Sequence, residues 1–322
     1  MTNEKAAAVM TTQLTSPLKS RDLVAIGDLS AEEIVRILDL AAAMKGKTNA
    51  DFSDRQVALV FYENSTRTYN SFVTAVHHLG ASICGFSNST GTSVLKGETL
   101  HDTIKMFEAY SDAIVLRHPR DGSARWAADV SKVPIINAGD GKNQHPTQTL
   151  LDLYAIWQTQ GRLSNLSVAL AGDLKYGRTV HSLAEGLSMF EGNTLYLASP
   201  NSLEMPDYLI RFLTERGVRV EEYSRLEDVA DKVDILYMTR IQRERMPDEM
   251  EYERVRGAFR LVTATLDGAR PNLRVLHPLP RVDEIDIELD GTDFAYYFEQ
   301  AAGGVDVRKA LLTLLLGGHG GR

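Results

Sequence analysis

Short apolar runs alternate with amphipathic segments along the first half of the chain. The segment after the first run puts Phe72, Ala75, Val76 and Leu79 on one helical face and ends at Gly80. The apolar runs have the composition of β-strands and cover residues 57–62, 82–86, 113–117 and 134–137. Strands that alternate with helices are typical of a parallel sheet covered by helices on both faces.

The same alternation restarts in the second half, after a long helix predicted over 145–159 that ends before Gly161. Its strand candidates are 167–171, 194–198, 219–223, 234–239 and 274–276. We therefore predict an α/β fold with two doubly wound domains, each a mainly parallel sheet flanked by helices. The predicted parts are a flexible tail (1–17), a first domain (18–147, with a C-terminal helix 298–317), a linking helix (148–160) and a second domain (161–297).

Composition excludes several classes of function. The formal net charge is −8, so the 322-residue chain carries no basic footprint for nucleic acid or lipid. Cys84 is the single cysteine, which rules out intrachain disulfides and cysteine-rich zinc sites. No apolar run has the length of a membrane span, and the first residues do not resemble a signal peptide. We expect a cytoplasmic protein without a metal or membrane partner.

The candidate chemistry begins at the sequence FYENSTRT, where Ser65, Thr66, Arg67 and Thr68 start the helix that follows the first strand. A single capped helix with a solvated arginine would be an ordinary structural feature. Here, however, backbone N–H groups, hydroxyls and a guanidinium are concentrated in one helical turn, and together they favour an anion such as phosphate.

Two further groups follow the carboxyl ends of predicted strands in the first half. Arg117 ends one strand, and His145 with Gln148 starts the helix after another. Arg117 alone is as compatible with an ordinary surface role as with a functional one, and a lone histidine such as His145 is more often structural than catalytic. Ligands of open α/β sheets bind beyond the carboxyl ends of the strands, so we expect Arg117 and His145 near Arg67.

The second half offers guanidinium groups at equivalent positions. Gly172 and Gly177, followed by Arg178, match a phosphate-binding loop with arginine in place of the essential lysine, so a nucleotide hydrolase is disfavoured. Arg240 leaves the strand 234–239, and Gln242 follows two residues later. Both arginines therefore follow predicted strands of the second half.

Phe61 to Thr68 resembles the carbamoyl-phosphate signature of the aspartate and ornithine carbamoyltransferases, and the likeness covers about residues 18 to 317 with its motifs in order. It implies that the first domain binds carbamoyl phosphate, the second binds aspartate, and the active site lies in the crevice between them. The implied carbamoyl-phosphate contacts are Ser65, Thr66, Arg67, Thr68, Arg117, His145, Gln148 and the turn Leu279–Pro280, which resembles a cis-proline turn.

The resemblance also assigns the acceptor side. It implies that Arg178, Arg240, Gln242 and Lys96 bind aspartate. Ornithine-specific members carry cysteine at the position of Pro278 and a Ser-Met-Gly motif, and this chain has neither. The implied reaction makes N-carbamoyl-L-aspartate, an early step of pyrimidine biosynthesis. The residues implied in catalysis are Arg67, Thr68, Arg117, His145 and Lys96.

The likeness further implies a homotrimer in which the loop with Ser93 and Lys96 reaches the active site of the adjacent subunit. Lys96 taken alone would be an ordinary solvated lysine. The family requires no cofactor, and a separate regulatory chain is a possible partner. One departure is Tyr69, which stands where relatives have arginine. A non-catalytic protein that binds dicarboxylates, or a carbamoyltransferase with another amino-acid acceptor, is the alternative.

Overall fold

The computed structural model describes residues 18–48, 51–241, 250, 252–253, 256 and 259–317. The chain divides into two compact units. Unit 1 ends at Thr147 and resumes at Gly304, and unit 2 runs from Gln148 to Gly303. Two helices, α6 (Pro146–Gln160) and α10 (Tyr297–Leu316), contribute residues to both units.

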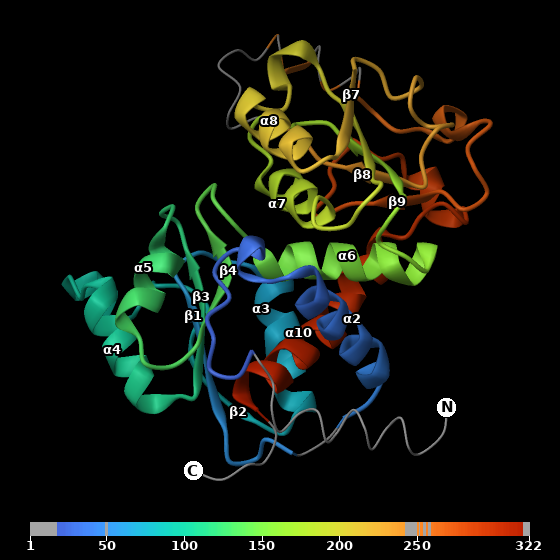
Figure 1. Cartoon of the computed structure of the whole chain (residues 1–322). Coiled ribbons are helices and arrows are strands. Elements are labelled where there is room, and N and C mark those ends of the chain that lie inside the picture. The colour runs from blue at the N-terminus through green and yellow to red at the C-terminus, as the bar shows by residue number, and fades with distance from the viewer. Residues whose placement is uncertain are drawn as a thin grey trace, which may run out of the picture. The chain divides into compact units, whose positions relative to one another are not determined.

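Unit 1 contains a four-stranded parallel sheet in the order β2-β1-β3-β4. Figure 1 shows α4 and α5 on one side of this sheet and α2, α3 and α10 on the other. The strands are β1 (Gln56–Phe61), β2 (Ser82–Phe86), β3 (Ala113–His118) and β4 (Ile135–Asp140). The helices are α2 (Ala31–Met44), α3 (Thr66–His78), α4 (Leu100–Tyr110) and α5 (Ser123–Val130).

The core of unit 1 follows from strands that are apolar on both faces. In β1, every residue from Val57 to Phe61 is buried. Ala58 and Val60 belong to a cluster with Ile104 of α4 and Ala127 of α5. Burial on both faces is what a central parallel strand requires, because helices cover each side.

Unit 2 contains a five-stranded parallel sheet in the order β7-β6-β5-β8-β9. Its strands are β5 (Ser167–Ala171), β6 (Thr194–Ala198), β7 (Arg219–Tyr223), β8 (Ile235–Met238) and β9 (Arg274–Leu276). Among its helices, α7 (Arg178–Leu187) packs on α8 (Asp207–Glu215), and α8 packs on β7. The predicted fold class, two parallel sheets flanked by helices, is confirmed.

Most differences from the predicted elements are shifts of boundaries. The strand β4 extends to Asp140, beyond the predicted end at Asn137, because its pairing with β3 changes register and continues to the pair His118–Asp140. A pattern of side chains does not encode such an irregularity.

In each sheet, the strand order reverses at one position. In unit 1 the chain moves outward from β1 to β2 and then returns to β3 on the other side of β1. In unit 2 it moves from β5 to β6 and β7 and returns to β8 on the other side of β5. Such topological switch points leave a crevice at the carboxyl ends of the two central strands, where ligands of α/β proteins bind.

Candidate functional site

The first turn of α3 follows β1 at the switch point of unit 1. Ser65 is the N-cap residue, with an extended backbone, but its hydroxyl makes no capping hydrogen bond. Thr66 and Arg67 are exposed, whereas Thr68 is buried. The amide groups in the first turn of a helix have no intrahelical partner, so this turn presents both backbone and side-chain donors to an anion.

Arg117 lies on the other side of the same switch point, near the end of β3. Its Nη1 donates to the carbonyl of Ala138 at 3.1 Å, and its Nε lies 3.7 Å from Glu63 Oε2. Burial lowers the pKa of Arg117, and the positive charge of Arg67 lowers it further, while Glu63 opposes both effects. The two guanidinium groups therefore share one electrostatic environment, which an anion would stabilise.

His145 connects the start of α6 with the start of α3. Its Nε2 lies 3.5 Å from the hydroxyl oxygen of Thr68, and its Nδ1 lies 3.4 Å from that of Thr147. Both His145 and Thr68 are buried. The structure thus brings together Thr68 and His145, which are far apart in the sequence and which we expected at one edge of the sheet.

The loop that leads to His145 is organised by Asp140, a carboxylate with no exposed surface. Asp140 accepts hydrogen bonds from the amide of Gly122 at 3.0 Å, the amide of Gln144 at 3.1 Å and Asn137 Nδ2 at 2.9 Å. A buried carboxylate with several donors holds its loop in one conformation. We did not predict a role for Asp140 from the sequence, although it lies in the glycine-rich segment before His145.

In unit 2, Arg178 is the first residue of α7, and Arg240 follows β8. The loop before α7 is tied to the end of β8, since the amide of Asp173 donates to the hydroxyl of Thr239 at 3.1 Å. Gly172 allows this approach, because a Cβ there would lie 2.4 Å from the carbonyl oxygen of Thr239. Both arginines are thus carried at the switch point between β5 and β8.

The remaining predicted positions of unit 2 that the structure describes are Gln148 and the turn Leu279–Pro280. Gln148 donates to Asp152 at 2.9 Å. The peptide bond between Leu279 and Pro280 is cis, as the sequence led us to expect. Gln242 lies outside the residues that the structure describes.

Ser93 and Lys96 bound the short 3₁₀-helix η2 (Ser93–Lys96), which follows the edge strand β2. Both are exposed, as is Leu95 between them, with 71% of its surface accessible. Within the described residues, neither forms a hydrogen bond with the first turn of α3. The structure of the single chain therefore does not join this pair to the donors around Arg67.

Tyr69, the departure from the family pattern, has a packing role. Its ring meets Phe61 edge-on, with centroids 5.2 Å apart and planes at 89°. Edge-to-face contact is a favourable arrangement for aromatic rings. Tyr69 therefore helps to pack the start of α3 against the end of β1.

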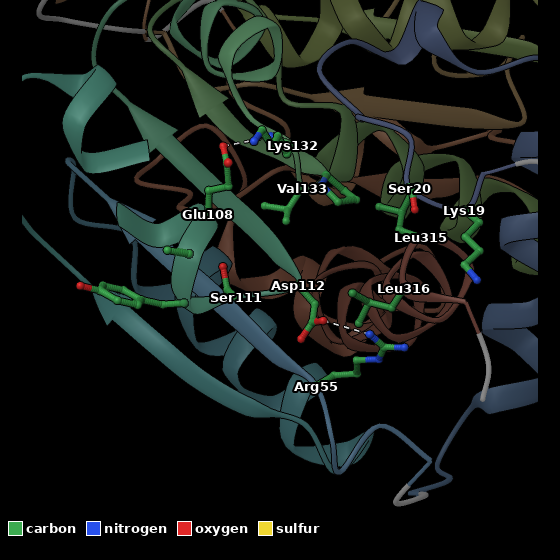
Figure 2. Close-up of a pocket in the computed structure, with 13 residues that line it drawn as sticks. Lys19, Ser20, Arg55, Glu108, Ser111, Asp112, Lys132, Val133, Leu315 and Leu316 are labelled. Carbon is green, nitrogen blue, oxygen red and sulfur yellow. Dashed lines mark hydrogen bonds and ion pairs between the residues drawn. The ribbon is translucent and has the colours of Figure 1, made fainter. Parts of the chain in front are cut away.

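A pocket of about 500 Å³ lies at the opposite edge of the sheet in unit 1. Figure 2 shows residues that line it. Its walls include Arg55, Asp112 and Pro134, which come just before β1, β3 and β4 and so lie at the amino ends of these strands. Arg55 donates to Asp112 at 2.9 Å, so these charges compensate each other. This pocket is separate from the candidate site at the carboxyl ends.

The described residues show neither a metal cluster nor a membrane-spanning helix. Among the described residues, no cluster of three or more His, Cys, Asp and Glu could hold a metal ion. No described helix has both the length and the apolar character needed to cross a membrane. The candidate donors are hydroxyls, amides and guanidiniums in unit 1, and, separately, two guanidiniums in unit 2.

Comparisons with known proteins agree with this chemistry. Residues 21–158 match the family model for the aspartate/ornithine carbamoyltransferase carbamoyl-P binding domain, and residues 164–315 match the model for the Asp/Orn binding domain. A protein of Chromobacterium violaceum, named aspartate carbamoyltransferase catalytic subunit, is 53% identical over 297 residues, which cover 92% of this chain and 98% of the relative.

Solved structures give the same result. The catalytic subunit of M. jannaschii aspartate transcarbamoylase is 46% identical, with a TM-score of 0.87 over 92% of this chain and 98% of its own. Aspartate transcarbamoylase from Trypanosoma cruzi is 34% identical over 95% of this chain and 99% of its own. Its TM-score is 0.89 in complex with N-(phosphonacetyl)-L-aspartic acid and 0.88 with carbamoyl phosphate and aspartate.

Proposed function

The chain belongs to the aspartate/ornithine carbamoyltransferase family, and from this we propose that it transfers the carbamoyl group of carbamoyl phosphate to the amine of L-aspartate. The products are N-carbamoyl-L-aspartate and phosphate. The observation that carries the proposal is the placement of Arg178 and Arg240 at the switch point of unit 2. Two guanidiniums there suit the two carboxylates of aspartate.

The donors of unit 1 suit carbamoyl phosphate. The first turn of α3, from Ser65 to Thr68, would hold the phosphate through backbone amides, hydroxyls and the guanidinium of Arg67. Arg117 and His145 would donate to the carbamoyl oxygen, supported by the contact of His145 with Thr68. Gln148 and the backbone of Leu279 and Pro280 would contact the carbamoyl nitrogen and the attacking amine.

The chemistry requires orientation and charge stabilisation, because carbamoyl phosphate is already activated. The amine of aspartate attacks the carbonyl carbon and a tetrahedral oxyanion forms. Phosphate then leaves with the electrons of the C–O bond and accepts the amine proton. Hydrogen-bond donors aimed at the developing oxyanion lower the barrier, and Thr68, Arg117 and His145 are the donors we assign to it.

The aspartate side includes two residues that need separate support. We assign Gln242 to aspartate on family likeness alone, since it lies outside the described residues. We also propose a homotrimer in which Ser93 and Lys96 act in the site of the adjacent chain. The exposure of Ser93, Lys96 and the apolar Leu95, in a segment with no buried residue, supports an intermolecular role.

We further place the reaction in the cytoplasm, in de novo pyrimidine biosynthesis. The free thiol of Cys84 suits a reducing compartment. The C. violaceum relative is named a catalytic subunit, which supports a separate regulatory chain as a further partner.

The direct test is product formation by the purified chain. Carbamoyl phosphate is supplied with L-aspartate or, in parallel, with L-ornithine, and carbamoylated amino acid and phosphate are measured. We expect carbamoyl aspartate and phosphate in equal amounts, no carbamoyl ornithine, and loss of activity in Arg67→Ala. Tight binding of aspartate without turnover would instead identify a binding protein, and preference for ornithine would overturn the assigned acceptor.

N-(phosphonacetyl)-L-aspartic acid gives a second, independent measurement. It carries a phosphonate and an aspartate in one molecule, so binding of its second half is intramolecular and its affinity should exceed that of either half by at least about 100-fold. Equal affinity for this compound and for phosphonoacetate alone would contradict the assignment of aspartate to Arg178 and Arg240.

A further inference from the structure

Asp152 lies at the centre of a buried hydrogen-bond network in unit 2. None of its surface is exposed, and its carboxylate accepts hydrogen bonds from three side chains. The donors are Gln148 Nε2 at 2.9 Å, Gln300 Nε2 at 2.6 Å and the hydroxyl of Tyr237 at 2.9 Å. An ionised carboxylate can only accept, so the carboxamides of both glutamines must turn their nitrogens towards it.

This requirement fixes the chemical identity of the group that Gln148 can offer to a ligand. The oxygen and nitrogen of a carboxamide lie on opposite sides of its carbon, so Gln148 Oε1 faces away from Asp152. The amino end of carbamoyl phosphate carries only N–H donors. Asp152 therefore sets Gln148 to present an acceptor, which is the group that this end of the substrate requires.

The network continues from Gln300 to His277, of which only 1% is exposed. Gln300 Oε1 accepts from the amide of His277 at 2.8 Å, and His277 Nδ1 accepts from the amide of Leu279 at 2.8 Å. A backbone amide can only donate, so Nδ1 carries no proton. The ring is then neutral, and its Nε2–H donates to Glu284 Oε1 at 2.7 Å.

The hydrogen bond from the Leu279 amide to His277 helps to hold a backbone conformation that leucine rarely adopts. Leu279 has φ of 53°, in the left-handed region, where a Cβ crowds the following carbonyl. Residues persist there only when surrounding contacts hold them. His277 supplies such a contact at Leu279, and Glu284 fixes the ring by also accepting from the amides of Val282 and Asp283 at 3.0 and 3.1 Å.

We propose that Asp152 and His277 are positioning residues for carbamoyl transfer: Asp152 orients the Gln148 carboxamide, and His277 holds the Leu279–Pro280 backbone in its substrate-binding conformation. The proposal rests on the proposed function, because it gives these two contacts their substrate. Both residues act through other groups and are themselves buried.

A pair of substitutions at His277 separates positioning from general stability. In His277→Asn the side-chain oxygen occupies the place of Nδ1 and can accept from Leu279, whereas in His277→Gln the side-chain nitrogen occupies the place of Nε2 and can donate to Glu284. We expect His277→Gln to lose about 100-fold in kcat through misplacement of the turn, and His277→Asn to stay within about tenfold of the wild type. The inhibition constant for inorganic phosphate should change in neither, since phosphate is assigned to unit 1.

Asp152→Asn tests the other half of the network, because one of its donors then faces an amide nitrogen. We expect kcat to fall about 100-fold, again without a change in phosphate inhibition. The control is Asn193→Ala, which removes a buried amide that bonds to Leu163, Leu166 and Leu187 elsewhere in unit 2. It should lower the melting temperature and leave kcat unchanged.

Amide hydrogen exchange at Leu279 supplies a readout that does not depend on activity. Exchange should be faster in His277→Gln than in His277→Asn at equal global stability. Equal exchange and equal kcat in the two variants, or kcat values that follow the melting temperature as for Asn193→Ala, would overturn the positioning role. Failure of the wild type to make carbamoyl aspartate would instead contradict the proposed function, while the exchange measurement still decides the role of His277 in holding the turn.

Discussion

Arg178 and Arg240 each carry one planar guanidinium at the carboxyl edge of the second sheet, although 62 positions separate them in the sequence (240 − 178). In the proposed reaction each binds one carboxylate of aspartate. A bidentate charged contact of this kind contributes on the order of 3 kcal/mol when its loss leaves the partner unpaired. The roles of these two residues are therefore measurable one at a time.

Replacing Arg178 or Arg240 by alanine should raise KM for aspartate by on the order of 100-fold and leave the phosphate inhibition constant nearly unchanged. Steady-state kinetics with each substrate varied in turn measures both. Arg219→Ala is the matched control, because Arg219 is an exposed arginine of the edge strand β7 paired with Glu221 at 2.6 Å. Weaker phosphate inhibition with an unchanged KM for aspartate would mean that the two substrates have been assigned to the wrong residues.

Glu284 links the buried network to pH. Burial by itself would raise the pKa of Glu284, but the hydrogen bond from His277 and the amide donors hold it below its ordinary value. A lowered carboxyl pKa in the folded state stabilises the protein above the unfolded-state pKa, and this stability is lost as the pH falls through the folded pKa. Glu284 should therefore contribute stability at neutral pH and lose it in acid.

Glu284→Gln should lower the melting temperature at pH 7, and its difference from the wild type should shrink as the pH falls below about 4.3, the ordinary pKa of glutamate. Thermal unfolding of both proteins between about pH 3 and pH 7 measures this difference. If the difference in melting temperature between the two proteins stayed constant from about pH 3 to pH 7, the charge of Glu284 would not contribute to stability.

At the scale of elements, the loop between β5 and α7 sets the position of Arg178. This loop approaches the end of β8 so closely that only glycine fits at position 172, where φ is 110°. The amide of Asp173 and the hydroxyl of Thr239 then join the two segments. A change at Gly172 should therefore disturb both the stability of unit 2 and the geometry of its guanidiniums.

Gly172→Ala should lower the melting temperature and raise KM for aspartate. Gly217→Ala is the matched control, because φ there is also positive, at 79°, but a Cβ would meet no atom within 4 Å. The strained backbone alone should lower the free energy of unfolding by about 1 kcal/mol, which lowers the melting temperature by roughly 2–4 °C for a domain of this size. For Gly172→Ala we expect the melting temperature to fall by at least twice this amount. KM for aspartate should rise in this variant only. Similar behaviour of the two variants would refute a steric role for the contact with Thr239.

At the scale of the whole molecule, the proposed trimer makes a prediction about mixed assemblies. Each active site would take His145 from one chain and Lys96 from its neighbour. In a ring that contains both His145→Ala and Lys96→Gln chains, about one site in three would then carry two intact residues. Two nearly inactive proteins should therefore regain activity after joint dissociation and reassembly.

Each variant reassembled alone is the control, and size-exclusion chromatography must show trimers in every sample. Recovery of a substantial fraction of wild-type activity in the mixture alone would support a shared site. If no recovery occurs in mixed trimers, then Lys96 acts in its own chain or takes no part in the reaction.

The sequence by itself determined the fold class, the alternation of strands with helices, and the segments that carry the candidate chemistry. Ser65 to Thr68, Arg117 and Arg178 were found because each stands next to a strand or helix boundary, and such boundaries leave a local signature in apolar spacing, glycines and caps. Several strands, such as β5 and β6, have the predicted bounds because their burial follows from contiguous residues. The functional roles of Ser65 to Thr68, Arg117 and Arg178 remain proposals.

Tertiary structure alone decided which distant residues meet. Asp152, Tyr237 and Gln300 form one network although they lie on three different elements, and nothing in their local sequence distinguishes them from ordinary polar residues of helices and strands. His277 stands two residues before the predicted turn Leu279–Pro280, but only the fold placed Gln300 and Glu284 around it. Local patterns report burial and periodicity, whereas the partners of a buried polar group depend on how the elements pack, which is a property of the whole unit.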